Sequence, residues 1–127
     1  MKKTDMRVVS LFAGAGGLDS GFERARFNVA WANEKDPQRW ETLEYNFPHV
    51  RLDKRDIRDI PSEDMPDDII GVVGGPPCQS WSEAGARRGI EDDRGKLFFQ
   101  YVRVLRDKQP LFFMAENVQG MLFKRNA

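Results

Sequence analysis

The sequence has one cysteine and one histidine among its 127 residues. A single cysteine excludes a disulfide within the chain, and such sparing use of cysteine is typical of proteins from a reducing cytoplasm. The histidine, His49, follows Phe-Pro in a predicted loop, and no pattern brings it near the cysteine, Cys78. The sequence therefore gives no support to a cysteine–histidine hydrolase, and we expect a cytoplasmic protein.

Long apolar runs and an excess of charge are also missing. No apolar run is long enough to span a bilayer, and the opening MKKTDMRVVS lacks the apolar region of a signal peptide. Lysine plus arginine equals aspartate plus glutamate at 20 each, so the net charge is zero. This balance neither indicates nor excludes a nucleic-acid partner, because a local basic loop can lie within a neutral domain. Length and a hydrophobic fraction of 40% predict one soluble domain.

Apolar runs alternate with amphipathic segments along the chain. We predict strands at residues 7–12, 27–33, 50–57, 69–73 and 111–115, and helices at 18–25, 36–47 and 96–108. This alternation is typical of an α/β domain, with a Rossmann-like parallel sheet of about five strands and helices on both faces. In such sheets ligands bind beyond the carboxyl ends of the strands. The polar or glycine residues at these predicted ends are Gly14, Gly16, Gly17, Glu34, Asp56, Cys78 and Glu116.

The loop after the first predicted strand reads FAGAGG. Glycines allow a sharp turn and close approach of a ligand, although a tight turn without a ligand is an equally good interpretation. Asp19 stands where the dinucleotide fingerprint has its third glycine, so a cofactor without phosphates, such as S-adenosylmethionine, fits better than a nicotinamide dinucleotide. Glu34 follows about twenty residues later, where an acid binds ribose hydroxyls; alternatively it caps the next helix. Asp56 could accept from an adenine amino group or be a solvated member of the charged run DKRDIRD.

Cys78 follows two prolines in GGPPC, directly after the fourth predicted strand. The prolines favour a stiff, shaped turn over a core strand, but a structural cysteine remains the alternative. A reactive thiolate needs nearby positive potential, and basic residues follow at Arg87, Arg88, Arg94 and Lys96. The loop at 79–95 could close on a nucleic-acid backbone or be an ordinary solvated loop. Glu116 should lie partly buried beside the cysteine turn. Burial raises the pKa of a carboxyl group, and a protonated acid can form a hydrogen bond to the edge of a base. The alternative is a glutamate that caps a helix or forms a salt bridge.

Taken in order, six segments resemble the first six motif blocks of the DNA (cytosine-5) methyltransferases. They are SLFAGAGGLDSGF, ANEKDP, RDI, GGPPCQSWSEAG, DRGKLFFQYVRVL and ENVQGM. The resemblance implies the fold of class I S-adenosylmethionine-dependent methyltransferases. It also implies that Cys78 is the catalytic nucleophile and that Glu116 holds the target base. The implied cofactor-binding residues are Phe12, Gly14, Ala15, Gly17, Leu18, Glu34, Lys35, Asp56, Ile57, Pro77 and Leu97.

The resemblance further implies methyl transfer to carbon 5 of cytosine in double-stranded DNA through a covalent cysteine adduct, in a bacterial restriction-modification setting. Family enzymes have further strands, a target-recognition domain and a final helix. We therefore expect residues 1–127 to be a truncated catalytic domain that lacks the target-recognition domain, or one subunit completed by a second chain. The alternatives are a tRNA cytosine-5 methyltransferase, a nicotinamide-binding Rossmann module and a non-catalytic cofactor-binding subunit.

Overall fold

The computed structural model describes residues 6–76 and 93–116 of the chain. These residues form one parallel sheet in the order β3-β2-β1-β4-β5. The strands are β1 (Arg7–Leu11), β2 (Asn28–Asn33), β3 (Arg51–Asp53), β4 (Gly71–Gly74) and β5 (Phe112–Ala115). The helices are α1 (Gly17–Arg24), α2 (Pro37–Asn46) and α3 (Asp93–Lys108), with 3-10 turns η2 (Ile57–Asp59) and η3 (Ser62–Asp64).

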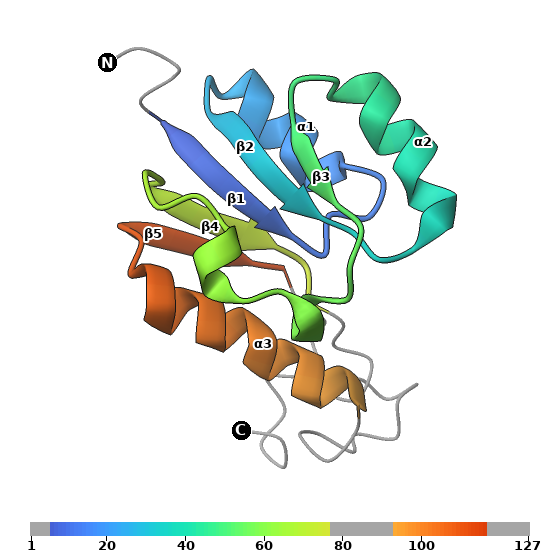
Figure 1. Cartoon of the computed structure of the whole chain (residues 1–127). Helices are drawn as coiled ribbons and strands as arrows, with labels where there is room; N and C mark the ends of the chain where they lie inside the picture. The colour runs from blue at the N-terminus through green and yellow to red at the C-terminus, as the bar shows by residue number, and fades with distance from the viewer. Residues whose placement is uncertain (1–5, 77–92, 117–127) are drawn as a thin grey trace.

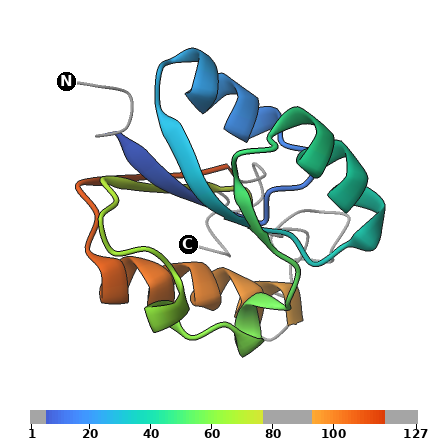
Figure 2. The same ribbon diagram turned by 45° about the horizontal axis from the view of Figure 1, so that its top comes forward.

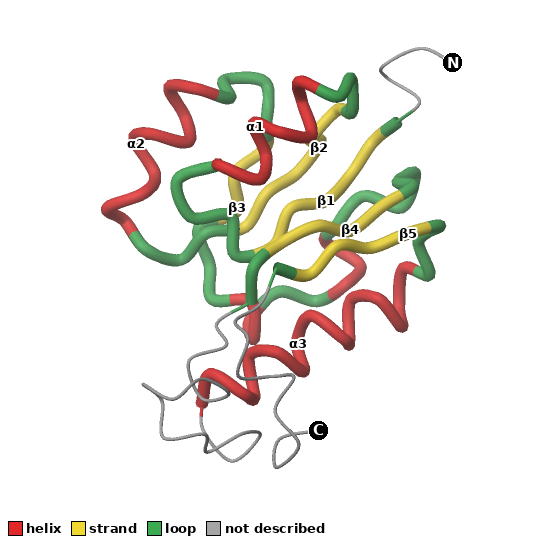
Figure 3. The backbone as a smooth tube through the Cα atoms, turned by 180° about the vertical axis from the view of Figure 1, so that it is seen from behind, coloured by secondary structure: helices red, strands yellow, loops and turns green. Residues whose placement is uncertain are grey.

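The predicted α/β fold is confirmed, with helices on both faces of the sheet. Helices α1 and α2 cover one face, while α3 and the two 3-10 turns cover the other (Figures 1 and 2). Strand β1 lies in the middle, and β3 and β5 form the two edges (Figure 3). The strand order reverses between β1 and β4. In sheets of this kind the crevice beside such a reversal is where ligands bind.

The central strands are buried on both faces, which explains why they read as continuous apolar runs. Alternate residues of β1 enter different clusters: Val8 packs with Val29 on the α1 face, and Val9 packs with Trp31 and Tyr101 on the α3 face. Each of these five side chains is at most 1% exposed. Because the central strands are packed on both faces, the loops that follow them begin at fixed positions along the carboxyl edge of the sheet.

Two helices begin by different means. Asp36 caps α2 by accepting from the Gln38 N–H at 3.0 Å, and Pro37 occupies the first turn, where the missing N–H costs nothing. Helix α1 has no side-chain cap; Gly16 precedes it in the left-handed conformation, with φ of 90°. Among residues 6–76 and 93–116, no helix is long and apolar enough to cross a membrane.

Most predicted boundaries differ from the structure by one or two residues, and two differ by more. The third strand was predicted at residues 50–57, but β3 ends at Asp53. The next aspartate, Asp56, caps η2 by accepting from the Arg58 N–H, and this local turn replaces further sheet pairing. Helix α3 begins at Asp93, whereas the helix was predicted from residue 96. The predicted loop at 79–95 lies outside the described residues, except for residues 93–95, which belong to α3.

Candidate functional site

A cavity of about 410 Å³ opens where strands β1, β2 and β3 end. This volume falls within the range of small-molecule binding sites. Phe12 follows β1, Glu34 follows β2, Asp56 and Ile57 follow β3, and Leu97 comes from α3. The complete lining comprises Phe12, Asn33, Glu34, Lys35, Asp36, Pro37, Asp56, Ile57 and Leu97. Six predicted cofactor-binding residues are therefore brought together, and Asn33, Asp36 and Pro37 join them.

The glycine loop borders this cavity and has an unusual backbone. Phe12, Gly14 and Gly16 all have positive φ, at 53°, 61° and 90°. A Cβ at Gly16 would lie 2.5 Å from Cε2 of Phe47, which follows α2. Glycine is therefore required at position 16 so that the loop can pass under α2. A Cβ at Gly14 would meet nothing within 4 Å, so open space lies next to this turn.

The Glu34 carboxylate joins the glycine loop to the start of α2. Oε1 accepts from the Gly14 N–H at 2.6 Å, and Oε2 accepts from the Asp36 N–H at 2.8 Å. The Glu34 carbonyl also accepts from Nε1 of Trp40 at 2.7 Å. The helix-cap alternative for Glu34 is wrong, because Asp36 is the N-cap of α2. Glu34 is instead part of the cavity lining. A carboxylate with two main-chain donors is held in one orientation.

Asp56 is the acid that the segment after β3 contributes to the cavity. Arg58 contacts both of its oxygens, with Nε at 3.1 Å from Oδ1 and Nη2 at 2.8 Å from Oδ2. Lys35 Nζ lies 3.2 Å from Oδ2. The hydrogen bonds from Arg58, helped by Lys35, hold the pKa of Asp56 well below its usual value, although partial burial opposes them. Asp56 is therefore a carboxylate at neutral pH and can only accept hydrogen bonds. The interpretation as a merely solvated charge is wrong.

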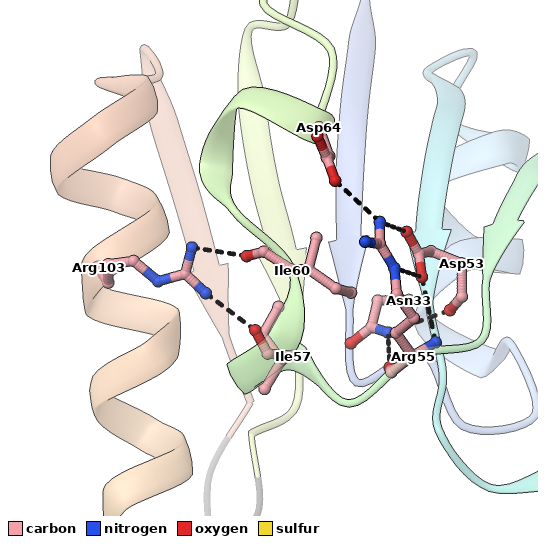
Figure 4. Close-up of polar contacts among 7 residues, drawn as sticks. All are labelled: Asn33, Asp53, Arg55, Ile57, Ile60, Asp64 and Arg103. Carbon is pink, nitrogen blue, oxygen red and sulfur yellow. Dashed lines mark hydrogen bonds and ion pairs between the residues drawn. The ribbon is translucent and has the colours of Figure 1, made fainter.

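Asn33 holds the path of the chain between β3 and Asp56. Its side chain is 2% exposed, and Nδ2 donates to the carbonyls of Asp53 at 3.0 Å and Arg55 at 2.8 Å. Arg55 in turn bonds the carboxylates of Asp53 and Asp64 (Figure 4). The charged run is thus a set of paired side chains around a fixed turn. The signal for Asn33 in the sequence is weak: it is the last residue of a predicted strand, directly before the acid Glu34.

Asp19 is a buried residue whose place the sequence did not indicate. It is 1% exposed in the first turn of α1, and Oδ1 accepts from the Ser10 hydroxyl at 2.6 Å. Burial raises the pKa of Asp19, while the Ser10 hydrogen bond opposes the shift. Asp19 therefore ties α1 to β1 beneath the glycine loop, at the place where a dinucleotide fold would have its third glycine.

The ends of β4 and β5 form a second part of the carboxyl edge. A Cβ at Gly74 would lie 2.1 Å from the Leu11 carbonyl oxygen, so only glycine allows β4 to approach β1 this closely. Glu116 donates its N–H to the Gly74 carbonyl at 3.0 Å, and its Oε2 lies 3.4 Å from the position of a Cβ on Gly75. Glu116 thus lies beside Gly74 and Gly75. Its predicted place beside Cys78 stays a prediction, because Cys78 lies outside the described residues. The expected partial burial is wrong, because the side chain is exposed.

Several predicted residues lie elsewhere. Gly17 and Leu18 line a separate apolar groove of about 250 Å³ with Met114, and Ala15 is exposed in the glycine loop. Pro77 and Cys78 lie outside the described residues. The roles of all these residues in binding or catalysis stay predictions. His49 is a half-exposed residue whose Nε2 lies 2.7 Å from Glu23. Within residues 6–76 and 93–116, no group of three or more potential metal ligands is found.

Comparisons with known proteins agree with this geometry. The C-5 cytosine-specific DNA methylase family matches residues 6–127. Type II methyltransferase M.NgoPII of Neisseria gonorrhoeae is 58% identical over 121 residues, which are 95% of this chain and 36% of that protein. Type II methyltransferase M.FnuDI of Fusobacterium nucleatum is 61% identical over 95% of this chain and 35% of its own length. The chain thus spans about a third of the length of these curated relatives.

Solved structures give the same result. The crystal structure of a prophage-encoded DNA modification methyltransferase (E. coli) is similar with a TM-score of 0.81 and 36% identity, over 96% of this chain and 34% of that one. The S. pombe Dnmt2 methyltransferase is similar with a TM-score of 0.71 and 25% identity, over 95% of this chain and 37% of that one.

Proposed function

The chain belongs to the C-5 cytosine-specific DNA methylase family, and we propose that it is the cofactor-binding and nucleophile-bearing part of a DNA (cytosine-5) methyltransferase. Enzymes of this family use S-adenosylmethionine as their methyl donor. The observation that carries the proposal is the cavity at the carboxyl edge. It brings together Phe12, Glu34, Lys35, Asp56, Ile57 and Leu97, which the family resemblance assigns to cofactor binding.

The chemistry of the cavity fits this cofactor. Glu34, Asp36 and Asp56 contribute carboxylates to the lining, and the cation Lys35 is already paired with Asp56. Arg58 and Lys35 compensate the charge of Asp56. Glu34 and Asp36 therefore give the site its net negative charge. A negative charge favours a ligand with a positive sulfonium and disfavours a pyrophosphate. Glu34 would accept from ribose hydroxyls, and Asp56 would accept from the adenine amino group. Bound S-adenosylmethionine supplies an electrophilic methyl group to the site.

A nicotinamide-binding module finds little support. The dinucleotide motif needs a third glycine for close packing of helix and strand. Asp19 occupies that place and is buried against Ser10. Support for a methyltransferase therefore comes from the loop itself as well as from the family match.

Cys78 is the proposed nucleophile. Its thiolate forms a bond to carbon 6 of cytosine, and the electron pair of the 5,6 double bond moves toward carbon 5. Carbon 5 then takes the methyl group, and the electron pair of the broken methyl–sulfur bond stays on the donor's sulfur. A base removes the carbon-5 proton, the double bond forms again, and the bond between sulfur and carbon 6 breaks. Glu116, in its protonated form, would donate to ring nitrogen 3 and reduce the charge that develops on the ring. Support comes from the place of Glu116 beside Gly75, three residues before Cys78.

The proposed substrate is cytosine in double-stranded DNA. A base within a duplex must be flipped out before a nucleophile can reach it. The relatives are about three times as long as the chain. We therefore propose that methylation also needs residues beyond these 127, from a longer chain or from a second chain.

The test is covalent trapping with DNA that contains 5-fluorocytosine. Fluorine replaces the proton that must leave, so a cysteine adduct should accumulate and migrate as a protein–DNA band in a denaturing gel. The chain is mixed with S-adenosylmethionine and with the part of M.FnuDI outside the matched residues. Cys78→Ser should abolish the band. An adduct that survives this change, or none from a complex that binds DNA and cofactor, would contradict the mechanism; adducts with 5-fluorocytosine RNA alone would favour an RNA substrate.

A further inference from the structure

Arg103 on α3 binds the turn that follows Asp56. Its Nη2 donates to the Ile57 carbonyl at 3.0 Å, and Nη1 donates to the Ile60 carbonyl at 2.9 Å (Figure 4). Nη1 also donates to the Ser62 hydroxyl at 2.9 Å. Its Nε donates to Oε1 of Gln100 at 3.1 Å. All three guanidinium nitrogens are therefore engaged. A planar group with fixed donors holds its acceptors in a fixed arrangement.

The turn held by Arg103 is a wall of the cavity. Ile57 begins η2, is 2% exposed and lines the cavity, and its carbonyl faces Arg103. Asp56 is the neighbouring residue and caps the same turn. A shift of the Ile57 peptide would therefore move the Asp56 carboxylate. Leu97 on the same helix as Arg103 also lines the cavity, so the Arg103 contacts align two parts of its wall.

The other end of this segment is fixed independently. Asn33 on β2 holds the Asp53 and Arg55 carbonyls, and Arg58 orients the Asp56 carboxylate. Asp56 thus lies between an anchor on the sheet and an anchor on α3. Figure 4 shows the two anchors on opposite sides of the segment. Removing Arg103 leaves the sheet anchor intact, so the chain can still fold while Asp56 loses its fixed position.

We propose that Arg103 is a positioning residue for adenine recognition, acting through Ile57 and Asp56. The inference rests on the proposed function, because it takes S-adenosylmethionine as the ligand. An oriented carboxylate accepts from the 6-amino group of adenine and repels the carbonyl oxygen that hypoxanthine carries at that position. Arg103 therefore contributes to the preference for an adenine ring without touching the ligand.

The experiment compares two ligands by calorimetry on the full chain. S-adenosylhomocysteine carries adenine, and S-inosylhomocysteine carries hypoxanthine. The wild type should prefer the first, and Arg103→Met should reduce the ratio of the two dissociation constants by about fivefold or more. Arg103→Lys should restore part of the preference, because its ammonium can reach one of the carbonyls. A general loss of stability would weaken the binding of both ligands equally and leave the ratio of their dissociation constants unchanged.

Lys108 provides a matched control on the same helix. Its Nζ also donates to a main-chain carbonyl, that of Met65, at 2.8 Å, but Met65 does not line the cavity. Lys108→Met should lower the melting temperature and leave the ligand ratio unchanged. Should Arg103→Met not fold, Ser62→Ala removes one acceptor of Arg103 and should reduce the ratio to a smaller extent.

The outcomes separate the two proposals. A folded Arg103→Met that keeps the wild-type ratio, or a Lys108→Met that loses it equally, would overturn the role of Arg103. A wild type that binds both ligands equally would also overturn it and leave cofactor binding intact. A folded wild type that binds neither ligand would overturn the proposed function itself.

Discussion

The Gly14 N–H donates a 2.6 Å hydrogen bond to the Glu34 carboxylate across a separation of 20 residues in the chain. The second oxygen of Glu34 accepts from the Asp36 N–H at 2.8 Å, so one side chain fixes both the glycine loop and the start of α2. Donors at both oxygens hold the carboxylate in one orientation. A group that the protein already orients reduces the entropic cost of binding.

Glu34→Ala should weaken S-adenosylmethionine binding by about tenfold or more, because hydrogen bonds to a charged group contribute roughly 1.5–3 kcal/mol each. It should also lower the melting temperature, since Gly14 and Asp36 lose their acceptor. Calorimetry and thermal unfolding measure the two effects. Glu44→Ala, on the exposed side of α2 beside Lys54, should change neither; an equal loss in both variants would contradict a specific role for Glu34.

Gly16→Ala should destabilise the fold by about 2–4 kcal/mol, since the new Cβ meets Phe47 and the backbone is left-handed. Gly17→Ala is the contrasting change, because a Cβ there meets nothing within 4 Å and lies in a helix. It should stabilise the chain by up to about 1 kcal/mol. Urea unfolding measures both. If Gly17 contacts the cofactor as predicted, Gly17→Ala should weaken binding despite the gain in stability; unchanged affinity would remove Gly17 from the site.

Asp19 should make stability depend on pH. Its folded pKa is raised above 3.8 by burial, so between these two values the native state holds a proton that the unfolded chain releases. The native state then binds more protons, and the free energy of unfolding falls as the pH rises through this window. Asp19→Asn should remove this fall when urea unfolding is followed from pH 4 upward.

Ser10→Ala is the companion variant for Asp19. The Ser10 hydroxyl lowers the pKa of Asp19, so its loss should extend the fall in stability to higher pH. Parallel pH profiles for the wild type and both variants would mean that Asp19 does not titrate differently in the folded chain.

Arg58 should have the opposite effect at low pH. Hydrogen bonds from Arg58 lower the pKa of Asp56, so the unfolded chain takes up a proton first as the pH falls below the ordinary value of 3.8. This contribution to stability is present above pH 3.8 and is lost below it. Arg58→Met should therefore make the loss of stability below pH 4 shallower. Arg39→Met serves as the control, since its contact with Asp36 is long at 3.9 Å; equal acid profiles for wild type and Arg58→Met would refute the prediction.

Strands β1 and β4 could be predicted because a parallel strand covered on both faces must be a continuous apolar run. The start of α2 could be predicted because Asp36 and Pro37 are local signals of a helix start. The end of the third strand could not be predicted from the sequence. In the charged run, aspartates pair with arginines two residues later and cap a turn, and these local bonds compete with sheet pairing.

The sequence by itself determined the alternation of strands and helices and the residues at the strand ends, since both depend on local periodicity and turn chemistry. Only the tertiary structure decided which of those residues meet. Arg103 binds the carbonyl of Ile57 46 residues away, and Asp19 is buried against Ser10. The sequence around a long polar side chain does not indicate which group will accept its hydrogen bonds. That acceptor depends on how the helix packs on the sheet.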